Sequence, residues 1–333
     1  MLTLTQAASL TKKGVIAFIV LTVLGVGGSI GYQVWHRYYL STLPPVVEKP
    51  EMKFGELPKP AFPDSNVSSS NYSYSLDTAT GGLPQTPKLL KVYFLPKSGV
   101  TLLAPDKSAK LAESLGFSSN PEVVSQTQFK FADDNDGELN VDLTTGNFNF
   151  QKQIASGSAT LNTLPDQTQI VGSFKNYLSA RGLLPDELKT GKSSVTFDNK
   201  NPTDSDTAEV TLWPTNVDDM PIVTAAFNRG LVRGTITKVD DENNKFIHIS
   251  YIYWPVDKST SSTYPLKTPE QAFADLRAGN GFVSIEPINP KVSISSVYLA
   301  YYEQEDYSPY LLPVFVFEGP DFAALVPAIA TPK

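Results

Sequence analysis

The feature that most constrains the chain is an uncharged apolar run near its N-terminus, residues 14–35, which reads GVIAFIVLTVLGVGGSIGYQVW. About 20 apolar residues in a helix are enough to cross the hydrocarbon layer of a bilayer, which is about 30 Å thick. The run therefore predicts a transmembrane helix over residues 14–35. A cleaved signal peptide is the alternative, but its apolar region would span only about 7–15 residues and end at a small-x-small cleavage site.

The residues that flank this run predict its orientation. Lys12 and Lys13 precede it, which favours a cytoplasmic tail over residues 1–13 and an extracytoplasmic remainder. Aromatic residues gather at the distal end, where their rings would lie at headgroup level; these are Tyr32, Trp35, Tyr38 and Tyr39. We therefore expect a single-pass protein of the cell membrane. Gly27 and Gly31 are spaced so that two such helices could touch, which makes a homodimer one option, although Gly is common in membrane spans without that role.

The composition changes after the span. Residues 36–87 are rich in Pro, Ser and Asn and include the tract SSSNYSYS. Proline blocks helix and sheet hydrogen bonding, and such a tract buries little apolar surface. We expect a semi-extended linker over residues 36–87, and we expect residues 88–333 to fold without the anchor.

Charge and cysteine content exclude several classes of function. Residues 1–41 hold three basic residues and no acidic one, which leaves 24 basic and 34 acidic residues in the rest of the chain. An ectodomain this acidic repels phosphate backbones, so nucleic acid is not an expected partner. Cysteine is absent, which removes disulfides and thiolate chemistry. We see no Gly-rich phosphate loop in the ectodomain and expect no cofactor.

The rest of the chain alternates between helical and strand periodicities, which predicts an α+β fold of tandem units, each a helix packed on an antiparallel sheet. The first small unit covers residues 88–155, with a strand at 90–96, a helix at 106–117 and a three-stranded meander at 129–150. The second, larger domain covers residues 160–330. It begins with an amphipathic helix that ends at Gly182. Residues 245–256 are apolar on both faces, which favours a central strand.

A later helix has unusually clear boundaries. Thr268 can cap its N-terminus, Pro269 suits the first turn, and Gln271 completes a capping box. Gly279 follows the last turn, where a left-handed residue commonly ends a helix. These signals predict a helix over residues 269–278.

The C-terminal third contains four characteristic segments: Tyr264–Leu276 (YPLKTPEQAFADL), Val297–Tyr302 (VYLAYY), Tyr310–Phe317 (YLLPVFVF) and Val326–Ile329 (VPAI). In these segments it resembles the YycH/YycI type of membrane-anchored accessory protein in bacterial signalling and, more broadly, PepSY-like folds. These motifs form a core and carry no chemistry, so they bear on fold more than on role. The resemblance implies a non-enzymatic regulator that contacts a protein partner in the envelope, such as a sensor kinase.

The titratable residues do not assemble into a recognisable active site. The chain has only two histidines, His36 at the membrane edge and His248 inside an apolar strand. The acidic run at 133–138 lacks the bidentate Glu of a calcium loop, because Leu143 stands at that position. It and the acidic residues at 218–219 and 240–242 are predicted to lie in turns. A binding or regulatory protein is therefore our leading reading; a carboxylate-dependent envelope hydrolase and a structural spacer are the alternatives.

A group of C-terminal tyrosines is the one sequence feature with the character of an interface. Tyrosine is enriched at protein-binding surfaces. The candidate partner-binding residues are Tyr298, Tyr301, Tyr302, Tyr307 and Tyr310. The alternative is that strand alternation turns one side of this group into the core.

Overall fold

The structure, a computed structural model, describes residues 25, 28–29, 31–33, 35–39, 49–97, 99–118, 120–154, 160–241 and 244–330. The chain divides into two compact units, Met1–Lys49 and Pro50–Lys333. In the first unit all described residues from 25 to 39 are helical, and Gly31 is exposed. Gly27 and most of the expected span lie outside the described residues. Within the described ranges, no helix is both long enough and apolar enough to cross a membrane.

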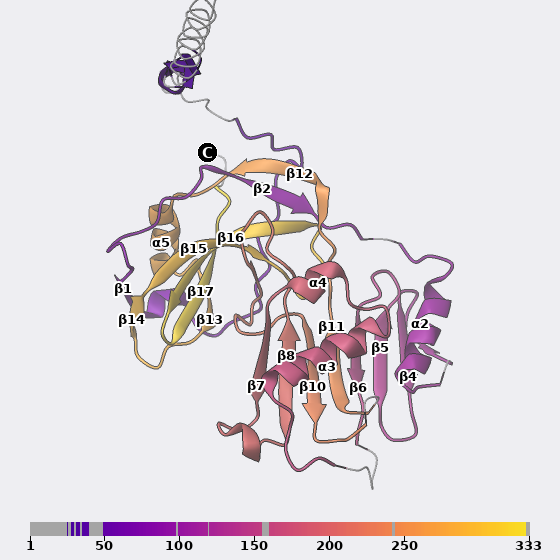
Figure 1. The fold of residues 1–333 in the computed structure, drawn as a ribbon. Coiled ribbons are helices and arrows are strands. Elements are labelled where there is room, and N and C mark those ends of the chain that lie inside the picture. Colours follow the sequence, from indigo (N-terminus) through magenta and orange to yellow (C-terminus); the bar gives the residue numbers. More distant parts are fainter. Residues whose placement is uncertain are drawn as a thin grey trace, which may run out of the picture. The chain divides into compact units, whose positions relative to one another are not determined.

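The larger of two main sheets in the second unit is antiparallel and has the strand order β3-β4-β5-β6-β11-β10-β8-β7 (Figure 1). Its strands are β3 (Glu122–Val123), β4 (Gln128–Ala132), β5 (Glu138–Asp142), β6 (Phe148–Gln151), β7 (Ser193–Phe197), β8 (Thr207–Leu212), β10 (Val232–Thr237) and β11 (Phe246–Tyr251). Three helices pack on one face: α2 (Ala104–Ser114), α3 (Gln167–Ser179) and α4 (Asp186–Thr190). The expected α+β class is confirmed, and sheets dominate it.

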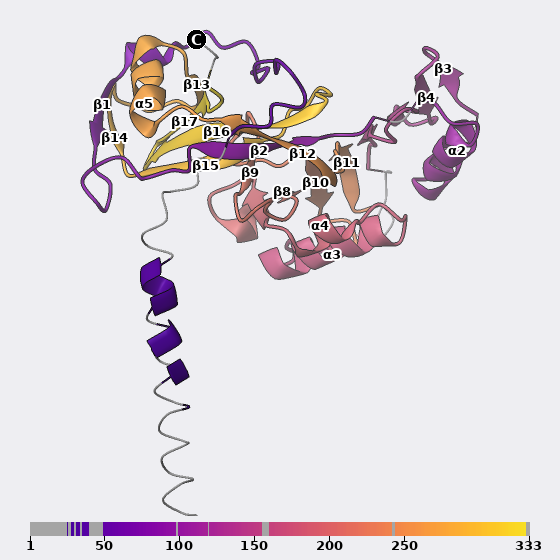
Figure 2. The same ribbon diagram turned by 90° about the horizontal axis from the view of Figure 1, so that it is seen from above.

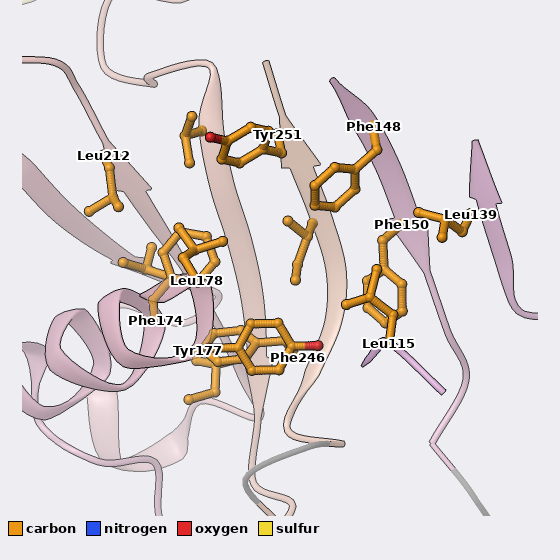
Figure 3. Close-up of a cluster of buried hydrophobic side chains, with 14 of the residues drawn as sticks. Leu115, Leu139, Phe148, Phe150, Phe174, Tyr177, Leu178, Leu212, Phe246 and Tyr251 are labelled. Carbon is orange, nitrogen blue, oxygen red and sulfur yellow. The ribbon is translucent and has the colours of Figure 1, made fainter. Parts of the chain in front are cut away.

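The core of this sheet lies under its helices. Figure 3 shows Phe174 and Tyr177 of α3 against Phe246 of β11, with ring centroids 5.2 and 4.9 Å apart. Gly234 lies directly below α3, and a Cβ there would stand 2.6 Å from the Phe174 ring. Glycine at this position therefore allows the helix to approach the sheet closely.

The predicted meander is present as β4, β5 and β6. Alternate side chains of each strand enter the core, as Phe131, Leu139 and Phe150 do. The turn between β4 and β5 places Asp136 in the left-handed region, with φ of 57°, which Asp tolerates better than most residues. The predicted central strand at 245–256 also exists over 246–251, where β11 lies between β6 and β10.

The second sheet has seven strands, in the order β12-β2-β16-β15-β9, with β17 paired to both β16 and β13. Its strands are β2 (Leu89–Phe94), β9 (Ile222–Val223), β12 (Asp257–Pro265), β13 (Phe282–Ile285), β15 (Ser296–Tyr302), β16 (Tyr310–Gly319) and β17 (Phe322–Pro327). The helix α5 (Pro269–Ala278) packs on it through Ala272 and Leu276. The described residues also include two short 3₁₀ turns, η1 (Ser69–Asn71) and η2 (Pro202–Asp204).

The boundaries predicted for α5 are confirmed. Thr268 Oγ1 accepts the Gln271 N–H, and Gln271 Oε1 accepts the Thr268 N–H at 2.8 Å, which completes the capping box. Gly279 ends the helix with φ of 92°. Glycine adopts this conformation without the steric cost that a Cβ would bring.

The division into units at 88–155 and 160–330 differs from the structure. The strand β2, expected in the first unit, belongs to the second sheet, where it pairs with β12 and β16. The meander, also expected in the first unit, belongs to the eight-stranded sheet instead, because β6 pairs with β11. Each sheet is therefore built from segments far apart in the sequence.

Residues 50–87, predicted to be part of a free linker, pack on the second sheet; we call them the strap (Figure 2). The Met52 and Phe54 N–H groups donate to β12, at Thr263 O and the Tyr264 hydroxyl. Further along, β1 (Ser73–Leu76) forms a parallel pair with β14 (Lys291–Ile294).

Aromatic residues explain why this Pro-rich segment does not behave as a linker. The Phe62 ring stacks on Phe282 at 5.0 Å, and the Tyr74 ring lies 5.6 Å from Phe322. The strap makes few backbone hydrogen bonds to the sheet, so the hydrogen bonds that proline cannot donate cost little free energy. Burial of the aromatic rings stabilises the strap by more than that cost. The part of the predicted linker from residue 50 onward is therefore structural.

The strap supplies the first testable expectation. A fragment that begins at Pro50 should unfold cooperatively in urea. A fragment that begins at Lys88 should have a free energy of unfolding lower by on the order of 3 kcal/mol or more, because several half-buried rings are removed. The measurement is the free energy of unfolding of both fragments. Equal stability would mean that the strap adds nothing to the fold and that the original expectation for residues 88–333 was correct.

Candidate functional site

The face of the eight-stranded sheet that α2 and α3 leave open carries polar side chains. In β10, Gly234 and Ile236 face the helical core, so Arg233 and Thr235 point to the opposite side. Strand pairing extends this side into one cross-strand row that spans seven strands at intervals of about 4.8 Å. The row consists of Lys130, Asn140, Asn149, Ser250, Arg233, Thr211 and Ser194.

A connection in the second sheet borders this polar face. It follows β15 and runs over residues 303–307 with the sequence Glu-Gln-Glu-Asp-Tyr. Its residues line two cavities, of about 510 and 600 Å³, whose other walls include residues of the polar face. Glu305 and Asp306 line both cavities. We call the two cavities together the cleft.

The first cavity combines side-chain amides with aromatic rings. Gln128, Asn140 and Asn149 line it on the side of the sheet. Trp254 and Tyr307 also line it, and their ring centroids are 5.5 Å apart. The Trp254 indole N–H donates to Gln304 O at 2.8 Å, and the Tyr307 hydroxyl donates to Leu95 O at 2.8 Å. Both rings are therefore held in place before any ligand enters.

The second cavity contains arginine and glutamate. Arg229 Nε donates to Glu209 Oε1 at 2.7 Å, and Arg233 Nη2 lies 3.9 Å from Glu305 Oε1. Arg233 Nε and Ser250 Oγ are buried and find no hydrogen-bond partner in the described part of the chain. Burial, reinforced by the Arg229 charge, lowers the pKa of the Arg233 guanidinium. Two unused polar atoms thus lie side by side in the row, on β10 and β11.

Glu303 is the most perturbed acid of this cavity. Its side chain is 4% exposed and has no ion-pair or hydrogen-bond partner among the described residues. Burial disfavours the charged form and raises the pKa of Glu303 to about 8. The carboxyl group is therefore mostly protonated at neutral pH. Glu305, two residues further on, has an exposed side chain.

The sequence analysis did not single out Glu303 or Arg233. It weighed the acids at 133–138, 218–219 and 240–242, which fall in turns, and passed over the acids between two apolar strands. A usable signal was present, because a charged residue inside an apolar strand, as in LVRGTITKV, marks the polar side of a sheet. The burial of Glu303 has no such local sign.

The turn acids bind groups of the chain itself, Asp133 within its own turn and Asp218 at the distant strand β2. Asp133 Oδ1 accepts the N–H groups of Asn135 and Gly137, both at 2.8 Å. Asp218, in a turn with φ of 48°, accepts the Tyr93 hydroxyl at 2.6 Å. Across the described residues, no group of three or more His, Asp or Glu side chains could hold a metal ion.

His248 lies in the polar face, in register with Thr235 and one strand from Gln151. Burial, followed by the Arg233 charge, lowers the pKa of His248, so the ring is neutral at neutral pH. It faces Glu209 across Thr235. His36, the other histidine, stacks on Tyr32 at 5.7 Å in the first unit.

The candidate tyrosines do not form an exposed interface, which corrects the sequence-based expectation. Tyr301 and Tyr302 are 0% and 2% exposed, and Tyr310 packs on Phe54 of the strap at 4.9 Å between ring centroids. Strand alternation on β15 buries both neighbours because each face of this strand has a covering layer. Tyr298 is only partly exposed, and its hydroxyl lies 3.2 Å from Glu318 Oε2.

The hydroxyls of Tyr301, Tyr302 and Tyr307 donate to backbone carbonyls of the chain itself. The Tyr301 hydroxyl donates to Lys91 O in β2, at 2.8 Å. The Tyr302 hydroxyl donates to Ala61 O in the strap, at 3.1 Å, and the Ala61 N–H donates to Gln304 Oε1. Only Tyr302 and Tyr307 of the five line the cleft.

Comparison with known proteins identifies no family. No protein-family model matches the sequence, and no curated protein matches it. Among solved structures, the chain is similar to the crystal structure of an uncharacterized protein from Eubacterium rectale, with 12% identity and a TM-score of 0.37 over 76% of this chain and 86% of that one. A likeness of this size carries no argument about function.

The buried Glu303 gives an expectation for pH dependence. An unfolded Glu titrates near pH 4.3, so between about pH 4.5 and 8 the folded state holds more protons than the unfolded state, and stability falls as pH rises through that window. Glu303→Gln removes this loss. Its melting temperature should match that of the unaltered protein near pH 5 and exceed it increasingly up to pH 8, by thermal unfolding in a pH series.

The matched control for this series is Glu305→Gln, which changes an exposed carboxylate of the same segment. Its melting temperature should not rise above that of the unaltered protein as the pH increases. If the melting temperatures of Glu303→Gln and the unaltered protein differ by a constant amount over the whole pH range, Glu303 is ionised in the folded state and its burial is not as described.

Proposed function

We propose that the protein is a membrane-anchored, extracytoplasmic binding or regulatory protein without catalytic activity, and that its ligand or partner occupies the cleft. The observation that carries the proposal is the cross-strand row of seven polar side chains, with unpaired atoms on Arg233 and Ser250. Buried polar groups without partners cost free energy unless something satisfies them. A ligand that enters the second cavity would supply a partner to Arg233, which lines that cavity, whereas Ser250 is fully buried and lines neither cavity.

The membrane anchor of this proposal rests on the uncharged run at 14–35 and its preceding lysines. A regulator of the YycH/YycI type, accessory to an envelope sensor or a wall-associated complex, is compatible with such an anchor. The motifs behind that resemblance contribute to the second sheet, as Tyr264, Leu276 and Phe317 do. They support the relationship through fold and leave the partner to experiment.

A carboxylate-dependent hydrolase is the second candidate, and one observation favours it. Glu303 and Glu305 line the same cavity, and Glu303 is protonated at neutral pH. A general acid needs such a raised pKa, with a second carboxylate nearby to act as base. One observation counts against this candidate. Arg233 lies beside Glu305, so the carboxylate that would have to act as base already has a charged partner.

The anchor and its orientation can be tested on cells. Protease added to intact spheroplasts should release a soluble fragment that holds the strap and both sheets, because these lie outside the cell. The readout is an immunoblot of the supernatant with an antibody to the ectodomain. Protection of the ectodomain until the membrane is lysed would reverse the orientation.

The cleft can be tested by complementation of a deletion phenotype. Asn149 is exposed in the first cavity and makes no side-chain hydrogen bond with the described residues, so Asn149→Trp should fill the cavity without harm to the fold. We expect it to abolish rescue at normal protein abundance. The matched control is Asn176→Trp, at an exposed position of α3 on the helical side of the sheet.

Glu303→Gln distinguishes the two candidate functions in the same assay. A binding protein should keep its rescue with this variant, because the side chain is already neutral in the folded state. A hydrolase should lose it, because an amide cannot deliver the proton. Full rescue by Asn149→Trp would contradict the proposed role of the cleft.

A further inference from the structure

A cavity of about 640 Å³ lies between the two helices that cover the eight-stranded sheet at its meander end. Its walls come from α2, from the C-terminal end of α3 and from the turn that follows β5. We call it the α2–α3 cavity. Its volume is within the range of about 300–1,000 Å³ that is usual for ligand pockets.

The apolar part of this cavity is aliphatic. Leu111 and Leu183 pack on the core of the sheet and remain partly uncovered, and Ala180 at the end of α3 is exposed. Val141 and Leu143 also line the cavity but are buried, so they add little accessible surface. Among the described residues that line it, none is aromatic. A hydrocarbon chain can therefore pack here, whereas a nucleobase would find no ring to stack on.

The charged residues of this cavity are mostly cations. Lys107, Lys110 and Arg181 line it, against one carboxylate, Asp142, so the net charge of the lining is +2. The other acids of α2, Asp106 and Glu113, do not line it. Because the ectodomain as a whole is acidic, the α2–α3 cavity is a local reversal of its charge.

The two lysines are available to a ligand. Lys107 and Lys110 lie within one turn of α2, both are exposed, and neither has an ion pair or hydrogen bond within the described part of the chain. Arg181 is already engaged, because its Nη1 donates to Tyr177 O at 3.0 Å and its Nη2 to Ser114 O at 2.9 Å. It joins the ends of α2 and α3, and we assign the ligand's charge to the lysines.

The segment before α2 adds aliphatic side chains at the rim. Gly99 and Thr101 line the cavity, and the neighbouring Leu102 and Leu103 are 99% and 61% exposed. Adjacent large aliphatic side chains in water are unfavourable, and such exposure commonly marks a surface that something apolar covers. A chain that extends beyond the cavity would reach these two leucines.

These features together favour one class of ligand. A small anion such as phosphate would leave the aliphatic surface uncovered, and a wholly apolar molecule would make no use of the lysines. An anionic polymer needs basic residues along the length of its backbone, whereas these two lysines occupy a single helical turn. A molecule with one aliphatic chain and one anionic head group uses both parts of the cavity.

We propose that the α2–α3 cavity binds an anionic amphiphile with a single aliphatic chain, of which a long-chain fatty acid is the simplest example. Its chain packs on Leu111 and Leu183, and its head group pairs with Lys107 and Lys110. Binding makes and breaks no covalent bond. The inference does not depend on the proposed function, because that function assigns its ligand to the cleft.

The test uses the full-length protein in phosphatidylcholine nanodiscs, because a detergent is itself an amphiphile and would compete. The probe is palmitate with a photoreactive diazirine on its chain, and peptide mass spectrometry locates the adducts after illumination. We expect adducts in peptides that contain residues 99–115 or 180–184. Adducts in the expected span at 14–35 measure how much probe enters the lipid and serve as the reference.

Unlabelled competitors test the chemistry of the head group. Palmitate and hexadecyl phosphate should displace the probe from the α2–α3 cavity. Hexadecanol and hexadecyltrimethylammonium have the same chain without an anionic head, and they should compete much more weakly. Equal competition by palmitate and hexadecanol would overturn the proposed pairing with the lysines.

Variants then locate the site. Lys107→Ala/Lys110→Ala should lower labelling of the cavity about tenfold, because two ion pairs are lost. Its control, Lys200→Ala/Lys258→Ala, removes the same charge from exposed positions that do not line the cavity. Ala180→Trp should block the cavity with both lysines in place, whereas Ser179→Trp, at the adjacent exposed position outside the lining, should not.

Three outcomes would overturn the inference. One is an equal loss of labelling in each variant and its control, and another is labelling confined to residues 14–35. The third concerns the source of the amphiphile and uses nanodiscs that contain phosphatidylglycerol, an anionic lipid with two chains. If phosphatidylglycerol displaces the probe and free palmitate does not, Leu102 and Leu103 contact the bilayer and the cavity takes up no single-chain ligand.

Discussion

Alternation across paired strands, interrupted by one register shift between β10 and β11, is the constraint on which the rest of this structure depends. Because side chains point to opposite faces with a period of two, a register shift of one residue in any strand would exchange its two faces. Seven strands of the larger sheet keep a common alternation, from Lys130 on β4 to Ser194 on β7. The helical side is therefore continuous core, and the other side carries a continuous row of polar side chains, which is exposed at Asn140 and Asn149 and buried at Ser250 and Thr211. The cleft exists because this second surface has no helix on it.

The second sheet contributes to the cleft through one connection. β15 ends in the core at Tyr302, and the chain then carries Glu303 and its neighbours along the polar face before β16 begins. Burial of Glu303 without a partner is expensive, and the group responds by keeping its proton. A neutral Glu303 lets the two sheets pack here without an uncompensated charge between them.

The strap shows how the same residue chemistry can serve the inside or the outside of a protein. Tyrosine is useful at interfaces because it joins a large apolar ring to a hydroxyl that can reach a partner. Tyr302 uses both properties on the strap, with its hydroxyl on Ala61 O and its ring 4.8 Å from Phe62. The sequence analysis assigned these tyrosines to a foreign partner, whereas Tyr302 contacts another segment of the same chain.

Local features were predictable because they depend on neighbours within about one turn or one strand. The Thr268–Gln271 capping box, the left-handed Gly279 and the alternation of Phe148 and Phe150 each carry their own signal. The α+β class and most strand positions followed from such signals. The central position of β11 was also predicted, although only one of its faces is apolar and the other carries His248 and Ser250.

Pairing between distant segments had no local signal. Asn149 and Ser250 are neighbours in the polar row although about a hundred residues separate them, and the assignment of β2 to the second sheet depends on β12 and β16. The alternation of each strand shows that it has a polar side, but only the order and register of the sheet bring those sides together. The sequence by itself therefore determined which residues could be polar and outward, and the tertiary structure decided that they form one cleft, because sheet partners are selected by packing of the whole chain.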